Sequence, residues 1–269
     1  MSRIDRKEGR RASGSDPGCY HDARPGYPER VFEILQQRCG LRRGSPTFEI
    51  GPGTGLSTRR LIELGSSPLV AVEPDERLAD FLSRTLGSTT AALDIHVASF
   101  EHADLPENYF ELGTSASAFH WLEEGSSLSK VARILREGGW WAMWWNLFFD
   151  ARTDEFHKAT RSLFDNLDHS PSWGSHGSPA FALDADSRIA KLAAVRAFEN
   201  IQFDVISFTA LFDTARLTRL YSTFSPISRL RPEERQRLLY DLAQIANKQF
   251  GGKVELGITT PIYTAQRRR

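Results

Sequence analysis

A glycine-rich loop stands between a strand-like and a helix-like stretch of the chain. Residues 49–55 read EIGPGTG; an apolar run precedes the first glycine, and a helical pattern follows the last. Gly51, Gly53 and Gly55 let the backbone turn sharply and approach a ligand closely, and the N-terminus of the following helix supplies free amide donors. We therefore expect this loop to bind a cofactor.

The spacing of these glycines separates two kinds of cofactor. A dinucleotide-binding loop has glycine at its first, third and sixth positions, but the sixth position counted from Gly51 is Leu56. Glu49 lies just before the first glycine, where its carboxylate would repel a pyrophosphate and would suit a cofactor with a cationic amino group. The glycine spacing and Glu49 therefore disfavour a nicotinamide-dependent oxidoreductase.

A second carboxylate follows the next apolar run. Glu73 lies 20 residues beyond Gly53, and a carboxylate at this point of an adenosine-binding sheet can accept hydrogen bonds from both ribose hydroxyls. Asp75, two residues later, is better explained as the N-cap of the next helix. The loop and Glu73 together indicate a cofactor that contains adenosine.

Short apolar runs that alternate with amphipathic helical stretches would position these residues. This alternation is typical of a parallel sheet covered by helices on both faces. The predicted strands are 47–50, 69–72, 95–98, 112–117, 140–145, 202–208 and 253–265, and helices are predicted at 56–64, 126–135, 213–221 and 232–250. The carboxyl ends of parallel strands meet at one crevice, where ligands bind. The residues brought to that crevice are Gly51, Glu73, Ser99, the segment 117–121 and Asn146.

Four tryptophans occupy the fifth predicted strand. Side chains alternate between the two faces of a strand, so Trp141 and Trp145 are expected on one face and Trp140 and Trp144 on the other. Large aromatic side chains at such positions usually pack beneath covering helices. We therefore interpret the cluster as core and not as a ligand site.

The alternation stops from about residue 150 to 200, where serine, glycine, proline and histidine are frequent. We predict a cap at about 150–200 that is inserted into one domain spanning 15–269. Residues 1–14 are rich in arginine and lysine with few large apolar side chains, which predicts a mobile N-terminal tail.

Composition argues against several partners. Lysine and arginine total 34, as do aspartate and glutamate, so no net positive field exists to attract nucleic acid. No apolar run approaches the roughly 20 residues of a membrane span. The two cysteines, Cys19 and Cys39, lack metal-ligand spacing and no signal segment is evident, which favours a cytoplasmic protein without a metal.

The chain resembles the class I S-adenosylmethionine-dependent methyltransferases, in particular the small-molecule group that includes trans-aconitate methyltransferase-like proteins. The resemblance extends from about Tyr20 to Ala265. Beyond the glycine loop and Glu73, it rests on YHDARPGYP at 20–28, VASFE at 97–101, AFHW at 118–121 and LREGG at 135–139. It implies an α/β fold with a Rossmann-like, seven-stranded, mostly parallel sheet, whose last strand is antiparallel.

The resemblance also implies which residues contact ligands. Residues expected to bind S-adenosylmethionine are Tyr20, Arg24, Glu49, Gly51, Gly53, Gly55, Glu73, Pro74, Ser99, Phe100 and Ser117. Trp121 and Asn146 are expected to contact a small-molecule acceptor. Relatives often carry aspartate at the position of Ser99, so a backbone group or a neighbour is expected to bind the adenine amino group here.

Aromatic side chains suit a sulfonium cofactor. A ring placed well against a cation contributes about 0.5–2 kcal/mol, and Tyr20, Phe100 and Trp121 are the candidates. For Phe100 the preferred role is to cover the adenine.

His120 has two possible roles. It follows the fourth predicted strand and can accept a proton near neutral pH, so it is a candidate catalytic base or acceptor-positioning group. Alternatively, it hydrogen-bonds a neighbour and shapes the pocket, because displacement at a sulfonium often needs no base. Both roles remain open at this point.

The expected reaction is transfer of a methyl group to an oxygen, nitrogen or carbon nucleophile of a small molecule. The alternative is a non-catalytic S-adenosylmethionine-binding or scaffold protein, which would keep Gly51, Gly53 and Glu73 but lack a working acceptor pocket. The sequence indicates neither the acceptor nor the oligomeric state.

Overall fold

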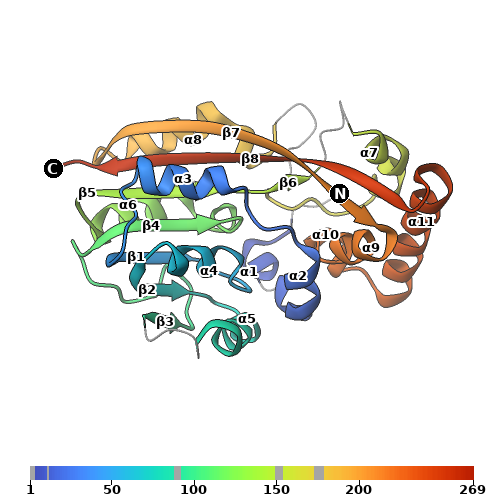
Figure 1. The fold of residues 1–269 in the computed structure, drawn as a ribbon, viewed down its shortest axis with the longest axis horizontal. Helices are drawn as coiled ribbons and strands as arrows, with labels where there is room; N and C mark the ends of the chain where they lie inside the picture. Colours follow the sequence, from blue (N-terminus) through green and yellow to red (C-terminus); the bar gives the residue numbers. More distant parts are fainter. Residues whose placement is uncertain (1–3, 11, 88–91, 149–153, 173–178) are drawn as a thin grey trace.

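The computed structural model describes residues 4–10, 12–87, 92–148, 154–172 and 179–269. Its strands are β1 Ser45–Ile50, β2 Ser66–Val72, β3 Leu93–His96, β4 Phe110–Ala116, β5 Leu135–Trp144, β6 Leu147–Phe148, β7 Phe198–Asp213 and β8 Lys253–Arg267. They form one sheet in the order β3-β2-β1-β4-β5-β8-β6, with β7 also paired to β8 (Figure 1).

Only β8 runs against the other strands: β1 to β5 pair in parallel, and β8 is antiparallel to β5, β6 and β7. The predicted Rossmann-like sheet with an antiparallel last strand is therefore confirmed. The sequence predicts seven strands, and the added one is β6, whose two residues are too few to leave a periodic pattern.

Helices cover both faces of this sheet. They are α1 Arg6–Arg10, α2 Pro17–Ala23, α3 Glu29–Gln37, α4 Leu56–Glu63, α5 Glu76–Leu82, α6 Glu124–Ile134, α7 Glu155–Thr160, α8 Ala185–Ala194, α9 Thr214–Ser222, α10 Ser225–Ser228 and α11 Pro232–Phe250. The Asp75 side chain caps α5 by accepting from the Arg77 amide, as the sequence predicts. Within the described residues, none of these helices is long and apolar enough to cross a membrane.

The tryptophans of β5 divide between two cores, as predicted. Trp141 and Trp145 lie in the core under α6 and α8, whereas Trp144 lies in the core under α3 and α4 with Trp140 packed against it. The alternation of side chains along one strand therefore supplies large aromatic groups to both faces of the sheet.

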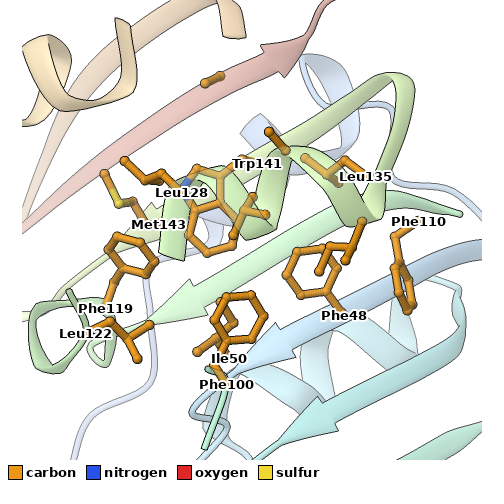
Figure 2. Packing of buried hydrophobic residues seen from close by; sticks show 14 of the residues in the cluster. Phe48, Ile50, Phe100, Phe110, Phe119, Leu122, Leu128, Leu135, Trp141 and Met143 are labelled. Atoms are coloured by element: carbon orange, nitrogen blue, oxygen red, sulfur yellow. The ribbon is translucent and has the colours of Figure 1, made fainter. Parts of the chain in front are cut away.

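The core under α6 is centred on the ring of Phe48 (Figure 2). This ring stacks on Phe100 and Trp141 at centroid distances of 6.2 and 6.1 Å, and it meets the edge of Phe110 at 5.1 Å. The ring fits because the neighbouring position on β4 is Gly113, where an added Cβ would lie 2.2 Å from the Phe48 ring.

β7 and β8 continue beyond the sheet into a second core (Figure 1). We call this part the helical lobe and define it as α7, α9, α10, α11 and the adjoining ends of β7 and β8. Its buried residues include Phe156, Phe212, Leu217, Leu242 and Leu256. The lobe therefore combines segments that lie far apart along the chain.

The structure divides the cap predicted at about 150–200. α7 packs in the helical lobe, whereas α8 packs with its Leu192 in the core of the main sheet. The reason is that each helix buries its own apolar face. α7, near the start of the segment, buries Phe156 in the lobe, and α8, near its end, buries Leu192 under the main sheet. The polar stretch at 173–178 lies outside the described residues.

Replacing Gly113 with alanine is expected to destabilise the fold. The added methyl group would overlap the Phe48 ring, which has no free space to move into because it is fully buried. Such overpacking typically costs about 1–3 kcal/mol of unfolding free energy, which urea denaturation measures.

The matched control is Gly257→Ala, because a Cβ at Gly257 meets nothing within 4 Å. We expect this control to change the unfolding free energy by less than about 0.5 kcal/mol. In a Phe48→Leu background the cost of Gly113→Ala is expected to shrink, because the overlapping ring is gone. Equal effects at Gly113 and Gly257 would contradict the packing argument.

Candidate active site

A cavity opens where β1, β2 and β4 end. Its empty volume is about 810 Å³, part of it open to solvent. The loops after these strands form its floor, and the segment from α1 to Tyr27 contributes one wall. Among the predicted cofactor and acceptor contacts, those that line the cavity are Tyr20, Gly51, Gly53, Glu73, Pro74, Phe100, Ser117 and Trp121.

The glycine loop forms the floor of the cavity. Gly51 and Gly53 have φ values of +65° and +58°, a region that favours glycine. A Cβ at Gly51 would lie 2.5 Å from the Cβ of Ala118, whereas a Cβ at Gly53 would meet nothing within 4 Å. Gly53 therefore leaves open the space that a ligand needs.

Gly55 serves the fold instead of lining the cavity. Its φ is +88°, and it immediately precedes the first residue of α4. A Cβ at this position would lie 2.6 Å from Leu82 Cδ1 on α5. The absence of a side chain thus lets α5 pack closely against the start of α4.

Glu73 links the ends of two strands. Its Oε2 accepts from the Gly53 amide at 3.1 Å, and its Oε1 accepts from the Asp75 amide at 3.0 Å. Burial raises the pKa of the Glu73 carboxyl to about 7, although these two backbone hydrogen bonds oppose the shift. Each oxygen keeps a further lone pair with which to accept from a ligand hydroxyl.

Glu49 lies behind the loop and does not line the cavity. It is fully buried on β1, and its Oε2 accepts from Thr58 Oγ1 at 2.7 Å, while its Oε1 has no hydrogen-bond partner among the described residues. Burial raises the pKa of this carboxyl to about 7. A buried carboxylate with one unsatisfied oxygen would favour a positive charge nearby.

Tyr27 is a cavity residue that the sequence reasoning did not single out. Its hydroxyl donates to Ser117 Oγ at 3.1 Å, and Ser117 holds a left-handed backbone conformation with φ of +54°. Burial raises the pKa of the Tyr27 hydroxyl, so this group stays protonated and donates. The signal was available, since Tyr27 belongs to the 20–28 motif that carries the resemblance.

Asn146 holds the wall of the cavity in place. Its Nδ2 donates to the carbonyl of Gly26 at 3.0 Å, and its Oδ1 accepts from Thr260 Oγ1 at 2.7 Å. The side chain therefore joins the N-terminal segment to β8, and it does not line the cavity.

Arg24 also anchors the N-terminal segment. Its Nε donates to Thr223 Oγ1 at 2.9 Å, and its guanidinium lies 4.5 Å from the centre of the Phe224 ring. Both partners lie in the turn between α9 and α10, and the guanidinium also lies 5.0 Å from the centre of the Tyr20 ring. Arg24 therefore supports a wall residue of the cavity without lining the cavity itself.

The segment after β3 supplies one cavity wall. Phe100 lines the cavity, and Lys130 Nζ on α6 fixes this segment by donating to the Phe100 carbonyl at 2.7 Å. Ser99 does not line the cavity, and its hydroxyl lies 2.8 Å from Nδ1 of His102. Phe100 is therefore the member of this segment that can cover a ligand.

Arg10 lines the cavity, although the sequence predicts a mobile tail over residues 1–14. Its Nη2 lies 2.5 Å from Glu101 Oε1 and donates to the Trp121 carbonyl at 2.8 Å. Gly9 packs against the Trp121 ring, because a Cβ there would lie 2.0 Å from it. The described part of this stretch is thus held by contacts with residues about 100 positions away, which composition cannot reveal.

His120 lies beside the cavity but does not line it. Its Nδ1 accepts a hydrogen bond from Trp145 Nε1 at 3.0 Å, which assigns the proton of the neutral ring to Nε2. To take a proton at Nε2, the ring would need a hydrogen on Nδ1, which would face the Trp145 donor. The geometry therefore favours a structural role over that of a base.

Comparison with known proteins identifies the domain. A family of methyltransferase domains matches residues 48–143. An uncharacterized methyltransferase of Schizosaccharomyces pombe is 24% identical over 94% of this chain and 96% of its own length. One from Mycobacterium tuberculosis is 34% identical over 49% of this chain, and the match spans 51% of that relative, about half its length.

The fold recurs in a solved structure. Phosphoethanolamine N-methyltransferase 2 of Haemonchus contortus, in complex with S-adenosyl-L-methionine, superimposes with a TM-score of 0.58 at 13% identity. The superposition covers 95% of this chain and 57% of that chain. Residues 48–143 are thus similar to methyltransferase domains, and the superposition shows that the chain has a Rossmann-like fold.

The chain is thus an enzyme whose cofactor is S-adenosylmethionine, and the residues of the cavity fit this cofactor. Gly53 leaves space above the loop, and Glu73 offers lone pairs to ribose hydroxyls. Phe100 and Trp121 supply aromatic walls. None of these four residues carries a positive charge of the kind that binds a phosphate group.

Replacing Glu73 with alanine is expected to weaken S-adenosylmethionine and S-adenosylhomocysteine equally, because both carry the same ribose. Loss of a charge-assisted hydrogen bond costs about 1.5–3 kcal/mol, or roughly 10-fold to 150-fold in the dissociation constant. Calorimetric titration measures both constants. Glu76→Ala, which removes an exposed carboxylate in the first turn of α5, is the matched control and should change neither; a loss for one ligand alone would contradict the ribose assignment.

Glu49→Gln is expected to remove part of the pH dependence of stability. Folding raises the pKa of Glu49 from 4.5 to about 7. The contribution of this carboxyl to the unfolding free energy of the wild type is therefore fully present below pH about 4.5 and is lost as pH rises through about 7. The isosteric amide stays neutral, so the variant should be more stable than wild type at pH 8 by up to about 3 kcal/mol. The difference should shrink at pH 5.

Urea denaturation at the two pH values measures this difference. Thr58→Val serves as a comparison, because it removes the donor to Glu49 but leaves the carboxyl in place. A variant Glu49→Gln that is less stable than wild type at pH 8 would show that the carboxylate is stabilised by a partner charge.

Proposed function

We propose that the enzyme transfers the methyl group of S-adenosylmethionine to an oxygen, nitrogen or carbon nucleophile of a small molecule. The observation that carries this proposal is the position of Arg10, Tyr20 and Tyr27, which approach the same cavity from the N-terminal segment. Because these side chains share the cavity with the glycine loop, they limit the space beside the donor, and a small acceptor fits that space better than a macromolecule. The equal numbers of acidic and basic residues also disfavour a nucleic acid as acceptor.

We assign the parts of the donor to the floor and walls of the cavity. The glycine loop, through Gly51 and Gly53, holds the methionine portion, and Glu73 accepts from the ribose hydroxyls. Pro74 and Phe100 enclose the adenine. Glu49 acts from behind the loop, where its buried charge favours the cationic amino group of the donor.

The acceptor side is assigned to Tyr20, Ser117 and Trp121. All three line the cavity; Ser117 and Trp121 follow β4, and Tyr20 belongs to the N-terminal wall. Tyr20 and Ser117, which the resemblance assigns to the donor, are thereby assigned to the acceptor in this proposal. In this assignment Arg24, Ser99 and Asn146 do not touch the ligands; Arg24 and Asn146 fix the wall, and Ser99 pairs with His102.

The chemistry needs little from the protein beyond placement. A lone pair of the acceptor attacks the methyl carbon in line with the carbon–sulfur bond, whose electron pair returns to sulfur to give S-adenosylhomocysteine. The acceptor proton, where one is lost, passes to solvent. Holding the two reactants in line and excluding water lowers the barrier, and aromatic rings near the sulfonium add about 0.5–2 kcal/mol each.

Incubation with isotopically labelled methyl donor and a metabolite library tests this proposal. Label that appears in one small product, together with S-adenosylhomocysteine, is the expected result. Donor binding without any labelled product would favour the non-catalytic alternative, and label in protein or nucleic acid would contradict a small-molecule acceptor.

His120→Gln is expected to leave turnover at saturating substrate within about tenfold of wild type and to preserve the pH profile. The reason is that His120 Nδ1 is occupied by Trp145, so the ring shapes the pocket instead of removing a proton. Trp145→Phe removes the same hydrogen bond from the other side and is the matched variant. A large loss of turnover, with loss of a titration near pH about 6.5, would instead identify His120 as the base.

A further inference from the structure

β7 is the terminal strand of the sheet on its side, and its outer edge is unpaired. Among the described residues, its ladder partner is β8 alone, and no other backbone hydrogen bond is made by residues 199–213. The strand is 16 residues long and runs along the edge of the molecule (Figure 1). Such an edge offers a continuous row of donors and acceptors to another strand.

This edge has few of the features that usually prevent pairing: its charged residues are the acidic Glu199, Asp204 and Asp213, and its register shift lies near its start. Proteins protect long edges with lysine, proline, bulges or short strands, but Phe198–Asp213 contains no lysine, arginine, proline or glycine. A register shift occurs only near its start, between Glu199 and Gln202, after which pairing with β8 is regular to Asp213. The charge of Asp204 is matched by Arg38 at 2.5 Å on the covered face.

Two large apolar side chains are exposed on the open face of this strand. Val205 is 51% exposed and Leu211 is 59% exposed. Both belong to the same face as Ser207 and Thr209, because side chains alternate along a strand, and all four are exposed. The opposite face, with Ile206 and its neighbours, packs against the cores.

The spacing of these two residues is self-complementary. In an antiparallel pair of identical strands, a two-fold axis through Phe208 places each residue opposite the one equally far on the other side. Val205 of one copy then faces Leu211 of the second copy, and Leu211 faces Val205. Side chains so placed lie about 4.5–5.5 Å apart at Cβ and stabilise the pair.

Neighbouring registers that preserve the two faces are less favourable. An axis through Thr209 would place Val205 opposite the carboxylate of Asp213, and an axis through Ser207 would place it opposite Thr209. The axis through Phe208 instead sets Asp204 opposite Phe212 and Asp213 opposite Phe203. No two like charges face each other in this register, which is the condition for stable cross-strand pairs.

We propose that the enzyme forms a two-fold dimer in which the β7 strands of two copies pair antiparallel about Phe208, so that both sheets become one continuous sheet. The interface is isologous, as expected for a closed dimer. Its specific contacts are the two Val205–Leu211 pairs and the Ser207–Thr209 pairs beside the axis. The donor cavity lies at the ends of β1, β2 and β4 and stays open in this assembly.

Sedimentation and light scattering of purified protein test the proposal. The wild type is expected at twice the chain mass of 30.3 kDa. The variant Val205→Lys with Leu211→Lys places two like charges opposite each other twice and is expected at 30.3 kDa. Because both side chains are exposed, circular dichroism of this variant should match wild type.

A charge-swapped variant tests the register itself. Val205→Lys with Leu211→Glu places lysine opposite glutamate at both positions, so the dimer should return, with a lower dissociation constant than the double-lysine variant. The dimer is overturned by a monomeric wild type or by a double-lysine variant that remains dimeric. The register about Phe208 is overturned if the charge-swapped variant dissociates as readily as the double-lysine variant.

Discussion

The hydrogen bonds of the Glu73 carboxylate are the constraint on which the rest of the site depends. One oxygen binds the amide of Gly53 after β1, and the other binds the amide of Asp75 at the start of α5. The amide of Gly51 adds a bond to the Val72 carbonyl at 2.9 Å. Because a buried carboxylate is costly without partners, these bonds stabilise both the carboxylate and the loop after β1. The floor of the cavity and the carboxylate that we propose to bind the ribose are therefore fixed together.

The N-terminal wall depends on the far half of the chain. Asn146 and Arg24 tie it to β8 and to the helical lobe, so Tyr20 and Tyr27 stand at the cavity without being part of the sheet. Polar side chains at strand ends can hold either a ligand or the protein backbone. Here Asn146 donates to the backbone carbonyl of Gly26 and so holds the N-terminal wall of the cavity in place.

Local periodicity was enough to predict most of the sheet. The ends of β1 and β2 and the opposite faces of Trp141 and Trp144 follow from patterns within a few residues. Contacts between distant residues leave no such pattern: Arg10 meets Trp121 across 111 positions. For the same reason the sequence could not show that α7 joins α9 and α11 in one lobe, or that Asn146 turns from the cavity. The roles of individual side chains toward the ligands stay predictions.

The place of β8 has a consequence for how the protein is made. It is the last strand along the chain, yet it lies between β5 and β7 and shares its length between two cores, with Leu256 in the lobe and Tyr263 in the main sheet. During synthesis β1 to β5 leave the ribosome with the edge of β5 uncovered, and neither core can close until β8 arrives. The long-range pairing then completes both at once. We therefore expect the sheet and the lobe to fold together, because both cores need residues of β8.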